Sequence, residues 1–297
     1  MDPVALACLA LAAVLHAAWN VLLKTAGDPL HRATIGLATA AAIALPVGVI
    51  AWAVEGRPAV PPQAWLVGLA SGAVETAYFA FLAEAYRRGD LSIVYPIARG
   101  SAPVLAVLAG VVLLGERLPP AGWLGVGLVL AGLLAVQRPW RFLVARADGR
   151  GAAGFALLTG VAIAGYSALD RVGVGLAPVW LYGAILWPSG AAGLAIVWLA
   201  RRRIRALPRG RGPSTAGTRR DDAIAGLLMF ATYTLVLVAL SLAPLVVVAP
   251  LRESAVVLVA AWGVFRLGEA ASGREMTIRL AGSILVVGGA AVLAVAR

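Results

Sequence analysis

The chain consists of long, uninterrupted apolar runs separated by short polar gaps. A helix needs about 20 mainly apolar residues to cross ~30 Å of hydrocarbon. Barrel strands would alternate polar and apolar positions, and these runs do not alternate. Because backbone groups in lipid must be paired internally, the pattern predicts an all-α membrane protein with ten transmembrane helices. The predicted spans are residues 3–23, 33–54, 63–86, 91–114, 120–137, 152–171, 177–200, 223–243, 245–265 and 277–296.

Two of the gaps are longer than the others and divide the chain. Residues 138–151 lie near mid-chain, and residues 201–222 are rich in Arg, Gly and Pro. We therefore expect a first five-helix repeat at 1–137, a connecting loop at 138–151, and a second five-helix repeat at 152–297. The second repeat contains the basic loop at 201–222.

The two halves carry matching motifs, which indicates an internal repeat. Each half has a proline followed closely by an arginine, a later Gly-Glu pair, an aromatic-polar pair with a cation one turn further on, and a mid-helix proline. These are 96–100 with 250–254, 115–118 with 268–269, 19–24 with 166–171, and Pro46 with Pro188. Five spans per half is an odd number, so the second half enters the membrane from the opposite side. This predicts two inverted repeats, typical of alternating-access carriers, with Pro46 and Pro188 as candidate hinges.

Composition narrows the function classes. Hydrophobic residues make up 61% of the 297 residues, charged residues 13%, and the mean hydropathy is +0.91, which excludes a soluble enzyme. The sequence carries no Gly-x-Ser-x-Gly, His-Glu-x-x-His or Gly-x-x-x-x-Gly-Lys motif, so we expect no enzymatic activity and no cofactor. The single cysteine, Cys8, excludes an internal disulfide and a cysteine metal cluster, and no bound metal is expected.

The distribution of charge predicts an orientation. The chain has 25 Lys and Arg against 14 Asp and Glu, a net charge of +11. These cations lie in gaps rather than on one helix face, so we expect no nucleic-acid partner. Nineteen lie in the loops after odd-numbered spans, four on the other side, and Arg99 and Arg252 lie within spans. Since basic loops stay in the cytoplasm, both termini are expected outside the inner membrane. The N-terminus lacks a basic signal-peptide segment, so the first span is expected to be retained.

Three stretches, residues 16–24, 85–100 and 114–118, resemble the EamA-like family of the drug/metabolite transporter superfamily. The first reads His-Ala-Ala-Trp-Asn-Val-Leu-Leu-Lys, and the second ends in Tyr-Pro-Ile-Ala-Arg-Gly. The resemblance covers the whole chain. It implies two inverted five-helix repeats around a central cavity, and export or uptake of small metabolites. Many superfamily members have both termini in the cytoplasm, opposite to the charge count. We keep the count, because orientation responds to the loops that are present.

Charged residues inside the spans mark candidate sites, because a charge in hydrocarbon is costly and faces a cavity or a partner. In the third span, Glu75 shares a helix face with Ser71 and Tyr78. In the fourth span, Arg99 lies one turn beyond Tyr95. These side chains are candidates for substrate binding or coupling.

Arg252 and Glu253 lie in the ninth span at nearly the depth of Arg99 and Glu75, so the four charges balance. Two interpretations stay open. In one, two ion pairs or a network lock the halves together. In the other, one carboxylate, above all Glu75, takes up a proton during the transport cycle.

Polar side chains also line one face of the first span. His16 and Asn20 lie one turn apart, and Trp19 is adjacent. Asn20 suits either a substrate or a backbone carbonyl that a proline has freed. His16 is either a proton carrier or a neutral hydrogen-bond partner between helices.

Aromatic residues of the second half form a further candidate group. Tyr166, Tyr233 and either Trp180 or Trp187 could box an apolar or cationic group, or serve in packing alone. Asp170 shares the face of Tyr166 and is expected near the helix end, paired with Arg171 beside it.

The sequence therefore predicts a secondary transporter for a small organic metabolite such as an amino acid, an amine or a related solute. Alternating access is the expected mechanism, with export favoured over uptake. No nucleotide-binding domain is present, so a gradient must drive any active transport, with protons as a candidate coupling ion. The alternative is a flippase or carrier for a lipid-linked or phosphorylated intermediate, with Arg99 and Arg252 holding the phosphate. Expected partners are a small-molecule substrate and the lipid bilayer, and both a monomer and a homodimer stay open.

Overall fold

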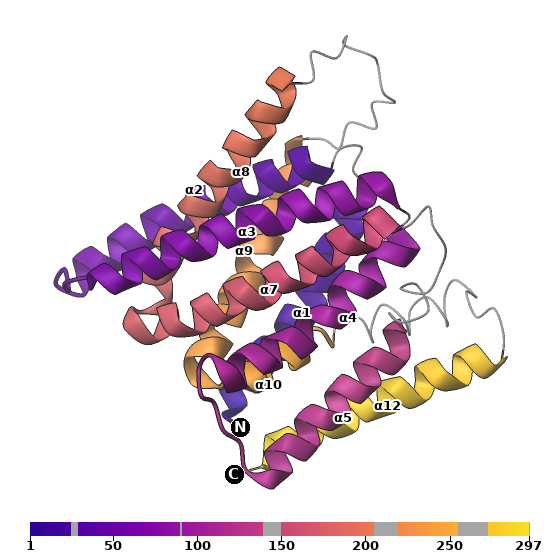
Figure 1. The fold of residues 1–297 in the computed structure, drawn as a ribbon. Helices are drawn as coiled ribbons and strands as arrows, with labels where there is room; N and C mark the ends of the chain where they lie inside the picture. The colour runs from indigo at the N-terminus through magenta and orange to yellow at the C-terminus, as the bar shows by residue number, and fades with distance from the viewer. Residues whose placement is uncertain (25–28, 90, 139–149, 205–218, 255–272, 297) are drawn as a thin grey trace.

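A computed structural model describes most of the chain as helix (Figure 1). The described residues are 1–24, 29–89, 91–138, 150–204, 219–254 and 273–296. The helices are α1 (Pro3–Lys24), α2 (Pro29–Val54), α3 (Pro62–Arg88), α4 (Leu91–Val112), α5 (Pro120–Gln137), α7 (Arg150–Leu176), α8 (Val179–Ile204), α9 (Arg219–Leu242), α10 (Leu245–Arg252) and α12 (Gly273–Val295). No strand occurs in these ranges, which confirms the all-α prediction.

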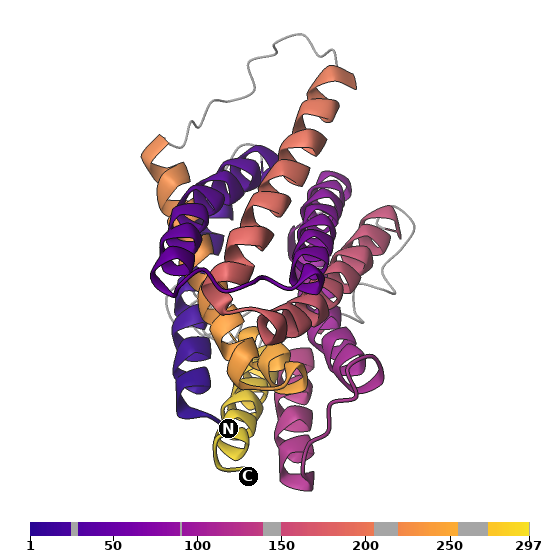
Figure 2. The same cartoon turned by 90° about the vertical axis from the view of Figure 1, so that its left-hand side faces the viewer.

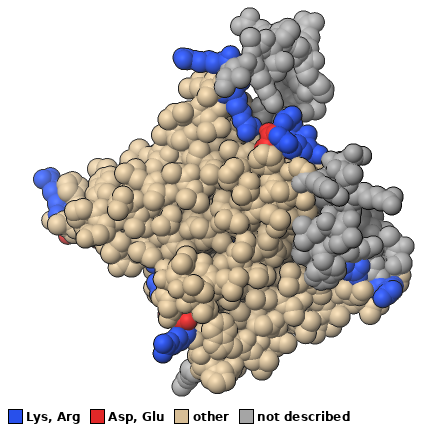
Figure 3. Space-filling model, in the orientation of Figure 1, with Lys and Arg blue, Asp and Glu red and all other residues tan. Residues whose placement is uncertain are grey.

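Each described helix begins within a few residues of the start of a predicted span. Eight of the described helices are long and apolar enough to cross a membrane. In α1 the apolar segment is described over Pro3–His16, and most of the predicted span 245–265 lies outside the described residues. Large apolar side chains face outward, with Leu66 and Ile284 each 70% exposed. Figure 3 shows a broad surface without charge and with Lys and Arg at its margins, as a lipid-facing belt requires.

Prolines determine where several helices begin. Pro3, Pro29, Pro62 and Pro120 are the first residues of α1, α2, α3 and α5, where a missing N–H costs no helical hydrogen bond. Pro244 precedes α10 and accepts hydrogen bonds from the backbone N–H groups of the first turn of that helix. The turn from α9 into α10 is therefore short, and the two helices remain in contact.

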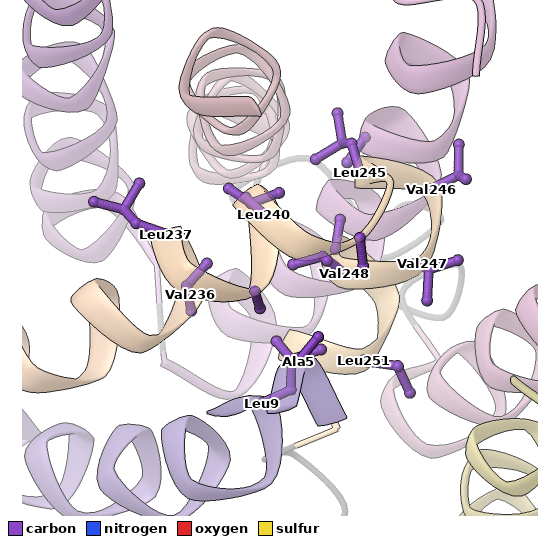
Figure 4. Packing of buried hydrophobic residues seen from close by; sticks show 14 of the residues in the cluster. Ala5, Leu9, Val236, Leu237, Leu240, Leu245, Val246, Val247, Val248 and Leu251 are labelled. Carbon is purple, nitrogen blue, oxygen red and sulfur yellow. The ribbon is translucent and has the colours of Figure 1, made fainter. Parts of the chain in front are cut away.

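The two chain termini lie together at one end of the molecule (Figure 2). The Met1 ammonium group donates to the carbonyl oxygens of Leu293 and Ala296, each at 3.3 Å. The largest buried apolar cluster includes the start of α1, where Ala5 and Leu9 lie, together with the end of α9 and most of α10 (Figure 4). Dense apolar packing thus joins α1, α9 and α10 near the termini.

Helices from the two halves of the sequence pack against each other throughout the bundle. Helix α3 packs on α7 and α8, α9 packs on α1 and α2, and α5 packs on α12. Small residues permit the closest approaches. A Cβ atom on Gly72 would overlap Ser189 Oγ of α8, and one on Gly132 would lie 2.5 Å from the Gly282 carbonyl oxygen of α12. Side chains from both halves therefore meet in the interior.

Candidate functional site

Three charged side chains lie buried where α4, α7 and α10 meet. Arg99 of α4 donates from Nη1 to both carboxylate oxygens of Glu253, at 3.2 and 3.4 Å. Arg252 donates from Nε to Glu253 Oε1 at 3.4 Å and from Nη1 to Ser167 Oγ of α7 at 3.1 Å. Arg99, Arg252 and Glu253, which we call the arginine cluster, are at most 6% exposed. Because two cations share one carboxylate, the cluster carries one excess positive charge.

Asp170 of α7 is held by hydroxyl groups instead of a cation. Its Oδ1 accepts hydrogen bonds from Ser71 of α3 at 2.5 Å and from Tyr182 of α8 at 2.7 Å, and its Oδ2 accepts one from Tyr233 of α9. The side chain is 0% exposed. A carboxyl group that only accepts hydrogen bonds has the hydrogen-bonding pattern of an ionised carboxylate. Asp170 thus connects four helices at one point.

Glu75 lies one turn along α3 from Ser71 and on the same face. It is 7% exposed, and its Oε2 has no hydrogen-bond partner in the described part of the chain. This oxygen lies against α8, because a Cβ atom on Gly190 would be 2.8 Å from it. Asp170 is within electrostatic range of Glu75. We call Glu75 and Asp170 the acid pair.

A row of four aromatic rings connects the acid pair with the arginine cluster. The ring centroids of Tyr78 and Tyr166 are 5.9 Å apart, those of Tyr166 and Tyr233 5.8 Å, and those of Tyr233 and Trp187 5.8 Å. All three contacts are edge-to-face, a favourable geometry for aromatic pairs. The guanidinium carbon of Arg252 lies 5.8 Å from the Tyr166 ring centroid. Trp187, one of the two predicted tryptophans, is therefore the one that joins this row.

Glu116, between α4 and α5, forms a third polar contact between the halves. Its carboxylate accepts hydrogen bonds from the backbone N–H groups of Leu245 and Val246, at 2.8 and 2.9 Å, and from Arg171 Nε at 3.2 Å. A carboxylate at a helix N-terminus interacts favourably with the unpaired N–H groups there. Glu116 thereby ties the first half to α7 and α10.

Two predicted pairings are wrong. Asp170 does not pair with Arg171, because adjacent helix positions point about 100° apart and the two side chains reach different neighbours. Glu75 does not balance an arginine, because both buried arginines share Glu253. The charges of the arginine cluster form a network, one of the two arrangements left open by the sequence.

The other predicted site residues have mixed outcomes. Tyr95 lies beside Arg99, with 5.9 Å from its ring centroid to the guanidinium carbon. His16 lies in α1 and is partly buried, whereas the side chains of Trp19 and Asn20 lie outside the described residues. Pro46 and Pro188 lie inside α2 and α8, and their role as hinges stays a prediction. Over the described ranges, no group of three or more His, Cys, Asp and Glu side chains could hold a metal ion.

Three contributing residues were not among the predicted site residues: Tyr182, Ser167 and Glu116. Glu116 had a sequence signal, the Gly-Glu motif that recurs in the second half, but the motif alone did not indicate a helix cap. Tyr182 stands near the start of α8, where an aromatic residue is typical of the membrane interface. Nothing in the sequence distinguishes that position from a tyrosine that turns inward to Asp170.

The first half of the chain is similar to a known protein family. Residues 4–137 match the EamA-like transporter family. The spermidine export protein MdtI of Salmonella paratyphi B, of Salmonella newport and of Salmonella heidelberg is 40% identical over 70 residues. These 70 residues are 24% of this chain and 64% of each relative, so the chain spans less than two thirds of the relatives' length.

Comparison with solved structures covers nearly the whole chain. One protein of known crystal structure matches 99% of this chain and 98% of its own with a TM-score of 0.70, at 22% sequence identity. At this identity the match shows a shared fold. With the eight apolar helices, the comparisons identify a multi-pass integral membrane protein.

Proposed function

We propose that the chain is a member of the EamA-like transporter family, which its residues 4–137 match, and that it is a secondary transporter for a small organic solute. The solute is an amino acid, an amine or a related metabolite, and export is the favoured direction. The similarity to a spermidine export protein supports an amine as the solute and export as the direction of transport.

The observation that carries the proposal is the buried polar contact between the two halves. Arg99 of the first half is ion-paired with Glu253 of the second, and Ser71 of the first half donates to Asp170 of the second. Buried charges in a membrane protein mark substrate and ion pathways. The arginine cluster suits a carboxylate, and the acid pair with its aromatic row suits an ammonium group. A solute that carries either group, or both, fits these surroundings.

The packing of the helices supports alternating access by two inverted repeats, 1–137 and 152–297. If the second half repeats the first, α3 corresponds to α9, α7 to α1, and α8 to α2. The contacts of α3 with α7 and α8 then have counterparts in those of α9 with α1 and α2. A two-fold arrangement of this kind suits rocking of one half against the other around a central site.

We further propose that the protein lies in the inner membrane with its basic loops in the cytoplasm and both termini outside. The two termini lie at the same end, as an even number of spans requires (Figure 1). A C-terminal reporter that fluoresces only in the cytoplasm stays dark if this orientation is right. Fluorescence would contradict the orientation and leave the transport proposal intact.

The second candidate is a flippase or carrier for a lipid-linked or phosphorylated intermediate. The excess positive charge of the arginine cluster favours it, because Arg99 and Arg252 have between them a single carboxylate partner. Guanidinium groups bind phosphate oxygens through charge-assisted hydrogen bonds.

Proteoliposomes containing the purified full chain separate the two candidates. A thermal-stability screen against amino acids and amines first selects a solute, because a ligand that binds only the folded state raises its stability. The proposal expects labelled solute to exchange across the vesicle membrane without translocation of labelled lipid. Lipid translocation without solute exchange would overturn it in favour of the second candidate.

A further inference from the structure

The acid pair differs from the other buried carboxyl groups described above, because one of its oxygens, Glu75 Oε2, has no hydrogen-bond partner among the described residues. Asp170 accepts three hydroxyl hydrogen bonds, whereas Glu75 Oε2 accepts none from the described residues. An ionised carboxylate as deeply buried as Glu75 requires a cation or hydrogen-bond donors. The two carboxyl groups therefore have different requirements although they lie on facing helices.

Four tyrosines, two arginines and one leucine among the described residues surround the acid pair. The tyrosines Tyr78, Tyr166, Tyr182 and Tyr233 face it from α3, α7, α8 and α9. Arg99 of α4 and Arg252 of α10 lie further along and are engaged by Glu253. Helix α2 contributes Leu37, whose Cδ2 would be 3.0 Å from a Cβ atom on Gly190. Arg252 is within electrostatic range of Asp170, but neither arginine is ion-paired with Glu75 or Asp170 in the described chain.

We propose that Glu75 and Asp170 form a single proton-binding site, which holds one proton on Glu75 in the state seen here. Two neighbouring carboxyl groups without a cation share a proton, because both cannot ionise together in a low-dielectric interior. The three hydroxyl donors fix the ionised group as Asp170, and the proton that neutralises Glu75 comes from solvent. This inference rests on the proposed function only in assigning the proton as the coupling ion.

The site also explains how proton binding acts on the two halves. Glu75 and Ser71 belong to α3 in the first half, and Asp170 belongs to α7 in the second, so the Ser71–Asp170 hydrogen bond crosses between them. If the proton moves to Asp170, that carboxyl becomes a hydrogen-bond donor, and its three hydroxyl partners can no longer all donate to it. Proton transfer from Glu75 to Asp170 therefore weakens a contact between the halves, and release of that proton to solvent with uptake of another proton by Glu75 resets the pair.

Infrared difference spectroscopy on the full chain in lipid vesicles, without any solute, tests the site directly. As pH is raised, the wild-type protein is expected to lose one protonated-carboxyl band. Glu75→Gln removes that band, whereas Glu84→Gln leaves it unchanged. Glu84 is a matched control, because it lies on the same helix and is ion-paired with Arg87 and Arg88 near its end. A band that persists in the Glu75→Gln protein would overturn the proposal, as would its absence from the wild type.

Transport measurements test the coupling separately. In proteoliposomes, Glu75→Gln is expected to retain solute exchange. The solute accumulation driven by a pH gradient should fall at least tenfold. Accumulation equal to that of the wild type would overturn proton coupling through the pair. If no amino acid or amine is moved by the wild type while the infrared band titrates as expected, the proposed function fails and the proton site stands. Tyr182→Phe is a second probe, because it removes one hydroxyl donor to Asp170, and it should alter the pH at which the band disappears. An unaltered titration in that variant would contradict a shared site.

Discussion

The arginine cluster contacts α7 at Ser167, the acid pair includes Asp170 of the same helix, and the two sites hold their carboxylates in opposite ways. In the arginine cluster, Glu253 is neutralised by two guanidinium groups. In the acid pair, Asp170 is held by three neutral hydroxyls, and Glu75 Oε2 by no described partner. Both sites connect the two halves of the sequence. Charge is thus compensated permanently in one region and left to a removable proton in the other.

This difference separates a structural contact from a switchable one. A buried ion pair is costly to break, because removal of one partner leaves a charge without compensation. A neutral carboxyl held by hydrogen bonds can change its protonation at lower cost. We therefore expect the same chemical change, a carboxylate replaced by its amide, to have a large effect on stability in the arginine cluster and a small one in the acid pair.

The largest expected effect is that of Glu253→Gln. It leaves Arg99 and Arg252 buried together without a counter-charge, and loss of a buried partner costs about 3–5 kcal/mol. The free energy of unfolding, measured by titration with denaturing detergent in mixed micelles, should fall by that amount. Glu84→Gln is the control, because its partner Arg87 is exposed and a surface ion pair contributes little to stability. Equal losses in both variants would show that the arginine cluster is not a structural lock.

Arg99→Met should have a smaller effect of the same kind. Glu253 keeps Arg252 as a partner, so one hydrogen-bonded contact is lost without leaving an unpaired charge. The expected loss is about 2 kcal/mol, typical of hydrogen bonds to charged groups. A double-mutant cycle between Arg99→Met and Glu253→Gln should reveal coupling, and strictly additive effects would contradict a direct pair.

The helices were predictable from the sequence, but the partners of the buried charges were not. A continuous apolar run about as long as the membrane is thick permits little besides a helix, and prolines at 62, 120 and 244 stand at or beside helix starts. Glu75, Arg99, Arg252 and Glu253 stood out because a charge within such a run is rare. Which charges meet depends on how helices from opposite halves are rotated, and one chain position moves a side chain by about 100°. For this reason Asp170 was assigned to Arg171 although it contacts Ser71.

Tyr233→Phe tests the hydroxyl support of Asp170 and should cost about 1–2 kcal/mol, because one of three donors to a buried carboxylate is lost. Tyr166→Phe is the matched control, since Tyr166 belongs to the same aromatic row and donates no described hydrogen bond to Asp170. The same detergent titration gives both values. Equal stability of the two variants would indicate that Asp170 does not depend on its hydroxyl donors.

The smallest expected change in stability is that of Glu75→Gln, and it decides the comparison. A protonated glutamic acid and a glutamine are both neutral and nearly identical in shape, so the free energy of unfolding should change by less than about 0.5 kcal/mol at neutral pH. The same substitution at Glu253 should cost several times more, although both side chains are almost fully buried. Burial alone predicts similar losses at the two positions. A loss of several kcal/mol in Glu75→Gln would mean that Glu75 is ionised and held by a partner, and the two regions would then differ in geometry but not in the way they compensate charge.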